Sequence, residues 1–246
     1  VDTIKRGMMV SDTVLGLLSQ KIRRLDERMQ EILKVASLLG YQFSEMMLLK
    51  VVSEFLRNTG ENERYKGVNG ARLNFCSYFS AEKVKALLNC AINEGLIERM
   101  KEDYQFSHDK LQKSFHDMVD ETLKIRLDYI IGKAYLTSDL SDRLYYAAVH
   151  LNKAGALVQD ESGFVDLANV NNGASKICRD KSAFLDAALF LRHGLSLLSE
   201  ERKWTDHFAL AFEMTESLAK MELVVGNLEA CKEITNEVLL RCKSVK

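Results

Sequence analysis

Proline is absent from this chain of 246 residues. Average usage of about 5% would supply roughly a dozen prolines at this length. Because proline lacks a backbone N–H and clashes with the preceding turn, it interrupts helix interiors. Its absence therefore favours a mainly helical protein with short connections. The 13 glycines are also few, and Gly40, Gly95 and Gly226 each stand where a helical pattern stops.

Long hydrophobic runs and cysteine motifs are missing as well. No apolar run approaches the ~18 residues of a membrane span, and no signal peptide is visible. The five cysteines form no CxxC pair, and Cys90 and Cys231 fall within apolar helical patterns. We therefore expect free, buried thiols in a reducing compartment, and a cytoplasmic protein with no membrane partner. Because the chain opens on Val1 and its helical pattern runs on to Lys246, we interpret it as an excerpt of a longer protein.

Motifs that carry catalytic chemistry are also absent. The sequence has no HExxH, no GxSxG and no metal-binding cluster of cysteine and histidine. It has no GxxxxGK[ST] phosphate-binding loop, since Gly132-Lys133 has no glycine five positions before it. The net charge is −1 with both signs interspersed, so we expect no nucleic-acid partner. The chain offers no catalytic or metal site of its own.

Helical periodicity dominates the first half of the chain. Apolar spacing predicts a helix over Thr13 to Leu25, a second from Asp26 to Gly40, and a third from Ser44 to about Asn58. Residues 59–79 show little periodicity and several glycines, so we interpret them as a surface loop or insertion. A fourth helix is expected over Ala81 to Ile92.

Alternation with a period of two residues occurs in one place. Leu96 to Met100 alternates apolar and polar residues, the polar turn Lys101-Glu102-Asp103 follows, and the alternation then resumes. We therefore expect strands only in a small hairpin near residues 96–107. Ser107 or Asp109 is expected to cap the helix that comes next.

The second half is a series of paired helices. The expected helices are Thr122–Leu136, Asp142–Ala154, Phe164–Cys178, Ser182–Leu198, Trp204–Val225 and Leu228–Cys242. A period of roughly 40 residues per pair fits a degenerate helical solenoid. We therefore expect two domains, residues 1–120 and residues 121–246, with the first helix of this series bridging them.

Several segments resemble one family. Asn93-Glu94-Gly95-Leu96-Ile97, followed by Phe106-Ser107-His108-Asp109, resembles the winged helix of signal-transduction ATPases with numerous domains, the STAND class. The most similar members are predicted AAA-type ATPases joined to protein kinases, histidine kinases or nucleotide cyclases. His108-Asp109 also matches the His-Asp of the MHD motif in plant NB-ARC proteins, with Ser107 in place of methionine. Gly226 to Ala230 resembles the turn of a tetratricopeptide (TPR) repeat.

The resemblance implies a mainly α protein, in which a winged-helix domain with a small β-hairpin precedes a TPR-like α-helical repeat array. In the resembling ATPases the histidine reaches the β-phosphate of bound ADP and holds the closed, inactive form. His108 is then the cofactor-binding residue here, and Asp109 orients its ring or caps the helix. The residues leave open the alternative that His108 is a helix cap without a ligand. The other histidines, such as His150, are expected to pack between helices or lie on the surface.

The function implied by the resemblance is regulatory. ADP or ATP would be bound mainly by an upstream nucleotide-binding domain of the same protein, absent from this chain, and the repeats would bind a protein partner. Two alternatives remain: an interaction scaffold that has lost switching, and the middle region of a MalT-like transcription activator. A DNA-binding winged helix is disfavoured because Ala81 to Ile92 offers only Lys83 and Lys85 as cations.

Overall fold

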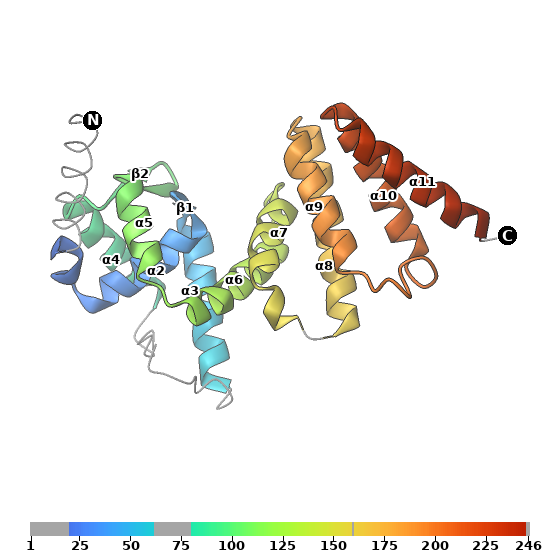
Figure 1. Ribbon diagram of the computed structural model, residues 1–246. Helices are drawn as coiled ribbons and strands as arrows, with labels where there is room; N and C mark the ends of the chain where they lie inside the picture. Colours follow the sequence, from blue (N-terminus) through green and yellow to red (C-terminus); the bar gives the residue numbers. More distant parts are fainter. Residues whose placement is uncertain (1–19, 62–79, 159, 245–246) are drawn as a thin grey trace, which may run out of the picture. The chain divides into compact units, whose positions relative to one another are not determined.

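The computed structural model describes residues 20–61, 80–158 and 160–244 (Figure 1). These residues are mostly helical and include one small three-stranded sheet, which confirms the prediction of a mainly α protein. The chain divides into two compact units, Val1–Ile130 and Ile131–Lys246, which are described separately below. Most of the helix expected over Thr13 to Leu25 and most of the loop expected over 59–79 lie outside the described residues. Among the described helices, none is both long and apolar enough to cross a membrane.

Unit 1 alternates helices with short strands. Its elements are α2 Glu27–Leu39, β1 Gln42–Ser44, α3 Glu45–Glu61, α4 Ala81–Asn93, β2 Ile97–Met100, β3 Asp103–Phe106 and α5 Asp109–Asp117. Helix α6, Glu121–Leu136, crosses the division between the units. The boundary at Ile130 thus falls ten residues beyond the expected residue 120, inside the helix that was expected to bridge the domains.

The helix ends of unit 1 follow local chemistry. The side chain of Asp26 accepts the backbone N–H of Arg28 at 2.8 Å and starts α2, and Gly40, with a φ of +135°, ends it. Ser80 caps α4 by accepting from the N–H of Lys83. Both ends of α2 are where the sequence predicts them, because a short acceptor and a glycine are local signals.

The sheet contains one strand more than expected. β3 is central, with β1 and β2 antiparallel on either side. The prediction that strands are confined to a hairpin near residues 96–107 is therefore wrong, because Gln42–Ser44 adds β1 at the edge. Three residues are too short for a period to show, and Phe43 becomes a strand residue by pairing with Tyr104, far along the chain.

Aromatic side chains build the core of unit 1. The ring of Phe43 lies 5.7 Å from that of Tyr104 and 5.6 Å from that of Phe106, and Phe106 lies 6.1 Å from Phe115. All four side chains are buried. Tyr104 donates its hydroxyl to Glu45 at 2.7 Å, so its one polar atom is satisfied. This core joins β1, β3 and α5 around large rings.

Unit 2 is a series of helices that pack in chain order. After α6 come α7 Arg143–Lys153, the 3₁₀ turn η2 Gly155–Leu157, α8 Glu161–Asp180, α9 Phe184–Ser196, α10 Phe208–Val224 and α11 Leu228–Ser244. Each helix from α7 onward packs against the next one, and α8 to α11 run alternately up and down (Figure 1). Their bounds agree closely with the expected pairs, except that α10 begins at Phe208 rather than Trp204.

Small residues let the helices of unit 2 approach closely. A Cβ added at Gly132 would lie 2.5 Å from Leu151, and one added at Gly173 would lie 2.5 Å from Leu144. At Gly194 it would lie 2.4 Å from Met214 and 3.0 Å from Asn171. Nine alanines among the described residues of this unit are also fully or almost fully buried: Ala134, Ala147, Ala148, Ala154, Ala168, Ala174, Ala187, Ala188 and Ala211. The core of unit 2 therefore depends on short distances between helix backbones.

The burial predicted for two cysteines is wrong. Cys90 is exposed and Cys231 is half-buried, whereas Cys178 is buried. Helix α4 buries Val84, Leu88 and Ala91, and Cys90 lies to one side of that row. Burial raises the pKa of the Cys178 thiol.

Candidate functional site

His108 is the residue that starts helix α5. It has extended backbone angles and its side chain accepts the backbone N–H of Lys110, which makes it the N-cap residue. The prediction that Ser107 or Asp109 holds this position is therefore wrong. The backbone N–H of Ser107 still donates to Leu96 O at 3.0 Å, continuing the pattern of the sheet, and Asp109 already lies in the helix.

The ring of His108 is held through its Nδ1 atom. The backbone N–H of Lys110 lies 3.1 Å from Nδ1 and 2.7 Å from Asp109 Oδ1, and Nδ1 also contacts that carboxylate oxygen. A ring protonated only on Nε2 accepts the Lys110 N–H, whereas a ring protonated on Nδ1 donates to Asp109. In either arrangement Nδ1 has a hydrogen-bond partner within the first turn of α5. The structure therefore places His108 and Asp109, the two residues predicted to form the site, in direct contact.

Both side chains remain open to solvent. The side chain of His108 is 60% exposed and that of Asp109 is 80% exposed. Within the described residues, Nε2 of His108 makes no hydrogen bond or ion pair. The exposed His108 ring is therefore accessible at the N-terminus of α5, where the helix dipole favours a negative group.

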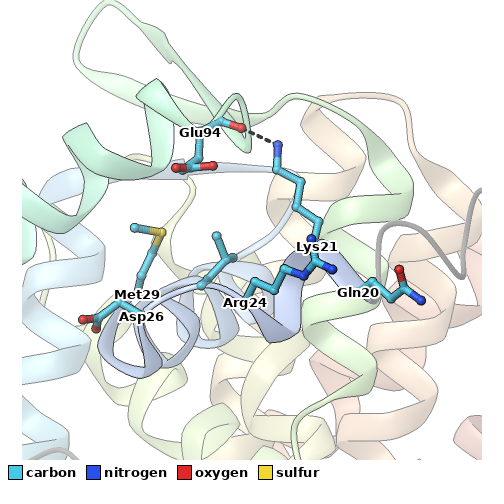
Figure 2. Close-up of a pocket in the computed structure, with 7 residues that line it drawn as sticks. Gln20, Lys21, Arg24, Asp26, Met29 and Glu94 are labelled. Carbon is cyan, nitrogen blue, oxygen red and sulfur yellow. Dashed lines mark hydrogen bonds between the residues drawn. The ribbon is translucent and has the colours of Figure 1, made fainter.

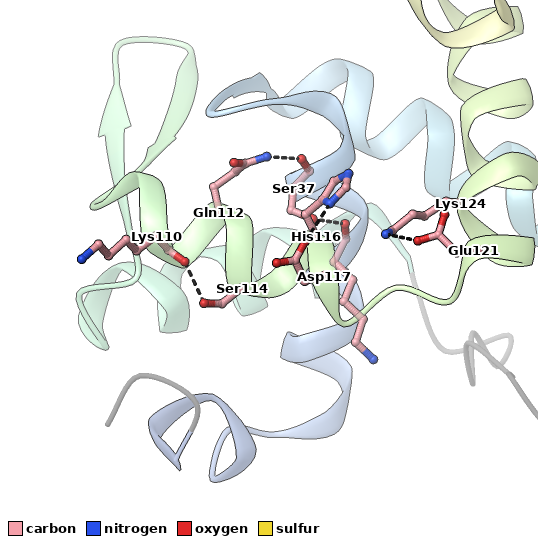
Figure 3. Close-up of polar contacts among 9 residues, drawn as sticks. Ser37, Lys110, Gln112, Ser114, His116, Asp117, Glu121 and Lys124 are labelled. Atoms are coloured by element: carbon pink, nitrogen blue, oxygen red, sulfur yellow. Dashed lines mark hydrogen bonds and ion pairs between the residues drawn. The ribbon is translucent and has the colours of Figure 1, made fainter. Parts of the chain in front are cut away.

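Helix α5 is fixed on α2 beneath this ring. Gln112 donates its side-chain N–H to the backbone oxygen of Ser37 at 2.7 Å (Figure 3). Leu111 and Phe115 are buried on the same helix, and Ser114 donates its hydroxyl to Lys110 O at 2.7 Å. Because these contacts anchor α5 over its length, the position of His108 is set by the core of unit 1.

A second histidine on α5 serves as an internal comparison. His116 lies near the C-terminal end of the helix, with Nδ1 3.4 Å from Asp117 Oδ1, and its side chain is 37% exposed (Figure 3). It repeats the His-Asp sequence of His108-Asp109, but it does so at the opposite helix end. There the helix dipole favours a cation rather than an anion.

The remaining described histidines take structural positions. His150 is buried and stacks on Tyr135 with the ring centroids 5.9 Å apart, which confirms its expected packing role. Burial lowers the pKa of His193. His207 lies 3.7 Å from Glu161. Across residues 20–61, 80–158 and 160–244, no cluster of side chains has the composition and geometry of a metal site.

One cavity of unit 1 was not anticipated. It measures about 430 Å³ and is lined by Gln20, Lys21, Arg24, Leu25, Asp26, Met29 and Glu94 (Figure 2). Lys21 crosses it and donates Nζ to Glu94 O at 2.6 Å, at the C-terminal end of α4. Arg28 donates to Asp26 and lowers the pKa of that carboxyl to about 2. Two cations and two carboxylates therefore line the same walls, so the cavity has no strong preference for one sign of charge.

The exposed face of α4 is nearly neutral. Lys85 lies 2.9 Å from Glu45, so one of its two expected cations has a carboxylate partner within the unit. A surface of this kind supplies little of the phosphate attraction that nucleic-acid binding needs.

Comparisons of the chain with protein-family models, with curated proteins and with solved structures found no match.

Proposed function

We propose that this chain is a regulatory segment of a STAND-type signalling ATPase. In this proposal unit 1 is a winged-helix domain that reads the nucleotide held by a neighbouring domain of the same protein. Unit 2 is a TPR-like array that binds a protein partner. The nucleotide is ADP or ATP, and hydrolysis takes place outside this chain.

The observation that carries the proposal is the position of His108. The order of elements in unit 1 is helix, strand, two helices and a hairpin, which is the winged-helix order, and the His-Asp pair follows the hairpin directly. The ring is exposed, yet α5 beneath it is anchored to α2 and to the core. An exposed histidine on a fixed element suits a contact that forms only when another domain closes over it.

The arrangement of unit 2 supports the second half of the proposal. Helices that pack mainly against their neighbours in the chain form an extended surface, as in helical repeat proteins. The α10–α11 turn at Gly226 has a φ of +84°, which favours glycine and agrees with the resemblance to a repeat turn.

The test is ADP release from the protein that carries this chain together with its nucleotide-binding domain. His108→Ala should speed the release by about 10- to 150-fold, because it removes one charge-assisted hydrogen bond and this factor corresponds to the free energy of such a bond. His116→Ala is the matched control, since it removes the second histidine of α5, which is half-buried at the other end of the helix, and should leave the rate unchanged. Equal release rates for wild type and His108→Ala would reject the nucleotide contact.

An interaction scaffold without switching is the second candidate. It is favoured by the fact that Nδ1 of His108 already has partners inside unit 1, so the residue has a structural role as a cap. Under this function the protein partner still binds unit 2, and His108→Ala changes the stability of α5 alone.

A further inference from the structure

Helix α9 of unit 2 leaves two leucines open to solvent. Leu185 is 68% exposed and Leu189 is 61% exposed, while the other side of the helix is buried against α8 and α10. Residues four positions apart on a helix are neighbours on one face, so these two side chains form a stripe along α9. The neighbouring helices therefore leave an apolar strip uncovered.

The end of α10 adds to this apolar surface. Glu222 of α10 contacts Arg192 of α9, and Leu223 and Val224, each 55% exposed, follow directly after that point. Two adjoining helices therefore expose large aliphatic side chains in the same region of unit 2. An exposed apolar surface of this kind, larger than a single scattered leucine, is typical of a site where another protein binds.

Two opposite charges flank Leu189 symmetrically. Asp186 precedes it by three residues, Arg192 follows it by three, and both residues are exposed. In an α-helix these positions lie about 4.5 Å to either side of Leu189 along the axis and about 60° to either side around it. Among the residues that the structure describes, Asp186 has no hydrogen bond or ion pair. Arg192 uses one terminal nitrogen on Glu222 and keeps further N–H groups for another acceptor.

We propose that this face of α9 binds a second copy of the chain, with the two α9 helices antiparallel about a two-fold axis through Leu189. Such an axis exchanges the positions three residues before and three residues after Leu189. Asp186 of each copy then lies opposite Arg192 of the other, and the two Leu189 side chains meet at the centre. Each contact occurs twice, as in the isologous interfaces of most homodimers.

The placement of the charges favours a second copy as the occupant. A face with Asp186 at one corner and Arg192 at the opposite corner is complementary to itself when it is turned by 180°. A parallel pairing would instead set like charges against each other, which electrostatic complementarity disfavours. The net charge of the chain is only −1, so overall repulsion between two copies is small. This inference is independent of the nucleotide contact proposed for unit 1.

Sedimentation equilibrium of the 246-residue chain over a range of concentrations tests the interface. We expect wild type to show a reversible equilibrium between monomer and dimer. Leu189→Glu places two carboxylates at the centre of the interface and should raise the dissociation constant of the dimer by at least roughly 100-fold. Leu239→Glu is the matched control, because Leu239 is a 54% exposed leucine of α11 and the residues three positions away, Asn236 and Cys242, carry no opposite charges. It should leave the dissociation constant unchanged.

A charge variant tests the antiparallel arrangement. Asp186→Lys sets a cation opposite Arg192 of the other copy and should weaken the dimer by roughly 3- to 30-fold at low salt, with a smaller effect at high salt. Asp166→Lys makes the same change of charge at an exposed position of α8 and should have little effect. Since all four substitutions are at exposed positions, the thermal transition followed by Trp204 fluorescence should stay close to that of wild type.

Three results would overturn the inference. A wild-type chain that stays monomeric at every concentration would leave this face to a different partner. A dimer that Leu189→Glu weakens no more than Leu239→Glu would place the interface elsewhere. A dimer that Asp186→Lys weakens no more than Asp166→Lys would reject the antiparallel pairing about Leu189.

Discussion

The two units of this protein are stabilised in different ways. Unit 1 brings together segments that are distant in the chain, and its core is filled by aromatic rings such as Phe106 and Phe115. Unit 2 packs each helix on the next, and its core contains alanines and glycines that shorten the distance between helices. Removing side-chain atoms from the core should therefore lower the stability of unit 1 most, whereas adding side-chain atoms should lower the stability of unit 2 most. The single tryptophan, Trp204, lies in unit 2, so its fluorescence can follow that unit separately.

Loss of volume should have its largest effect in unit 1. Phe106 is fully buried against Phe43 and Phe115. Phe106→Ala should lower the free energy of unfolding of unit 1 by about 3–5 kcal/mol. Far-UV circular dichroism should show a destabilised transition, while the Trp204 fluorescence transition stays in place. Met100→Ala, at an exposed position of β2, is the control and should change little.

In unit 2, the buried carboxylate of Glu222 should show the next largest effect. Its side chain is 1% exposed, contacts Arg192 of α9 and accepts the Asn227 side-chain N–H at 2.9 Å. Glu222→Ala removes both bonds and should cost about 1–3 kcal/mol, since the half-exposed Arg192 can turn to water. Chemical denaturation followed by Trp204 fluorescence measures this. Glu216→Ala, which breaks the exposed pair with Lys220, should cost much less; similar costs would remove the special role of Glu222.

Added volume should be unfavourable where unit 2 is closely packed. Gly194→Ala gains about 1 kcal/mol of helix propensity but places a Cβ 3.0 Å from Asn171 Cβ and 3.3 Å from Ala168 O. Overpacking costs about 1–3 kcal/mol, so we expect a net loss of about 1 kcal/mol. Gly155→Ala is the control, because nothing lies within 4 Å of the added Cβ. If Gly194→Ala proves as stable as Gly155→Ala, close packing does not limit unit 2 at this site.

The smallest expected effect concerns the pH dependence of the stability of unit 1. The Arg28 side chain holds the pKa of Asp26 at about 2, below its ordinary value of 3.8. A lowered folded-state pKa stabilises the protein above about pH 4, and this contribution is lost as the pH falls towards 2. Because Asp26 is largely exposed, we expect about 1 kcal/mol or less. Urea unfolding between pH 5 and pH 2.5 should show a smaller loss of stability for unit 1 in Asp26→Asn than in wild type, since Glu45, whose pKa is also lowered by its contact with Lys85, titrates in both proteins. An equal pH dependence in wild type and in Asp26→Asn would show that Asp26 does not make this contribution.

The same contrast explains what the sequence could predict. Helix bounds in both units depend on neighbours in the chain, so Asp26, Gly40 and the paired helices of unit 2 were predictable. Strand β1 was not, because only its pairing with β3 makes Gln42–Ser44 extended. The exposure of Cys90 also depends on which face of α4 meets the rest of unit 1.

The candidate site also has features that follow from adjacent residues and features that depend on distant segments. The proximity of His108 and Asp109 follows from adjacent positions in the chain. The choice of His108 rather than Ser107 as the cap does not, since it depends on how the end of β3 meets α5. The cavity around Lys21 and Glu94 joins distant segments and has no sequence signal beyond a few basic residues.

The central claim is that a bound nucleotide contacts the N-terminus of α5. Hydrogen–deuterium exchange of the protein with its nucleotide-binding domain, with and without ADP, tests this most directly. We predict that ADP slows exchange in the first turn of α5, around His108 to Gln112, and leaves the α10–α11 turn around Gly226 unchanged. Unchanged exchange in the first turn of α5 at saturating ADP would contradict the claim.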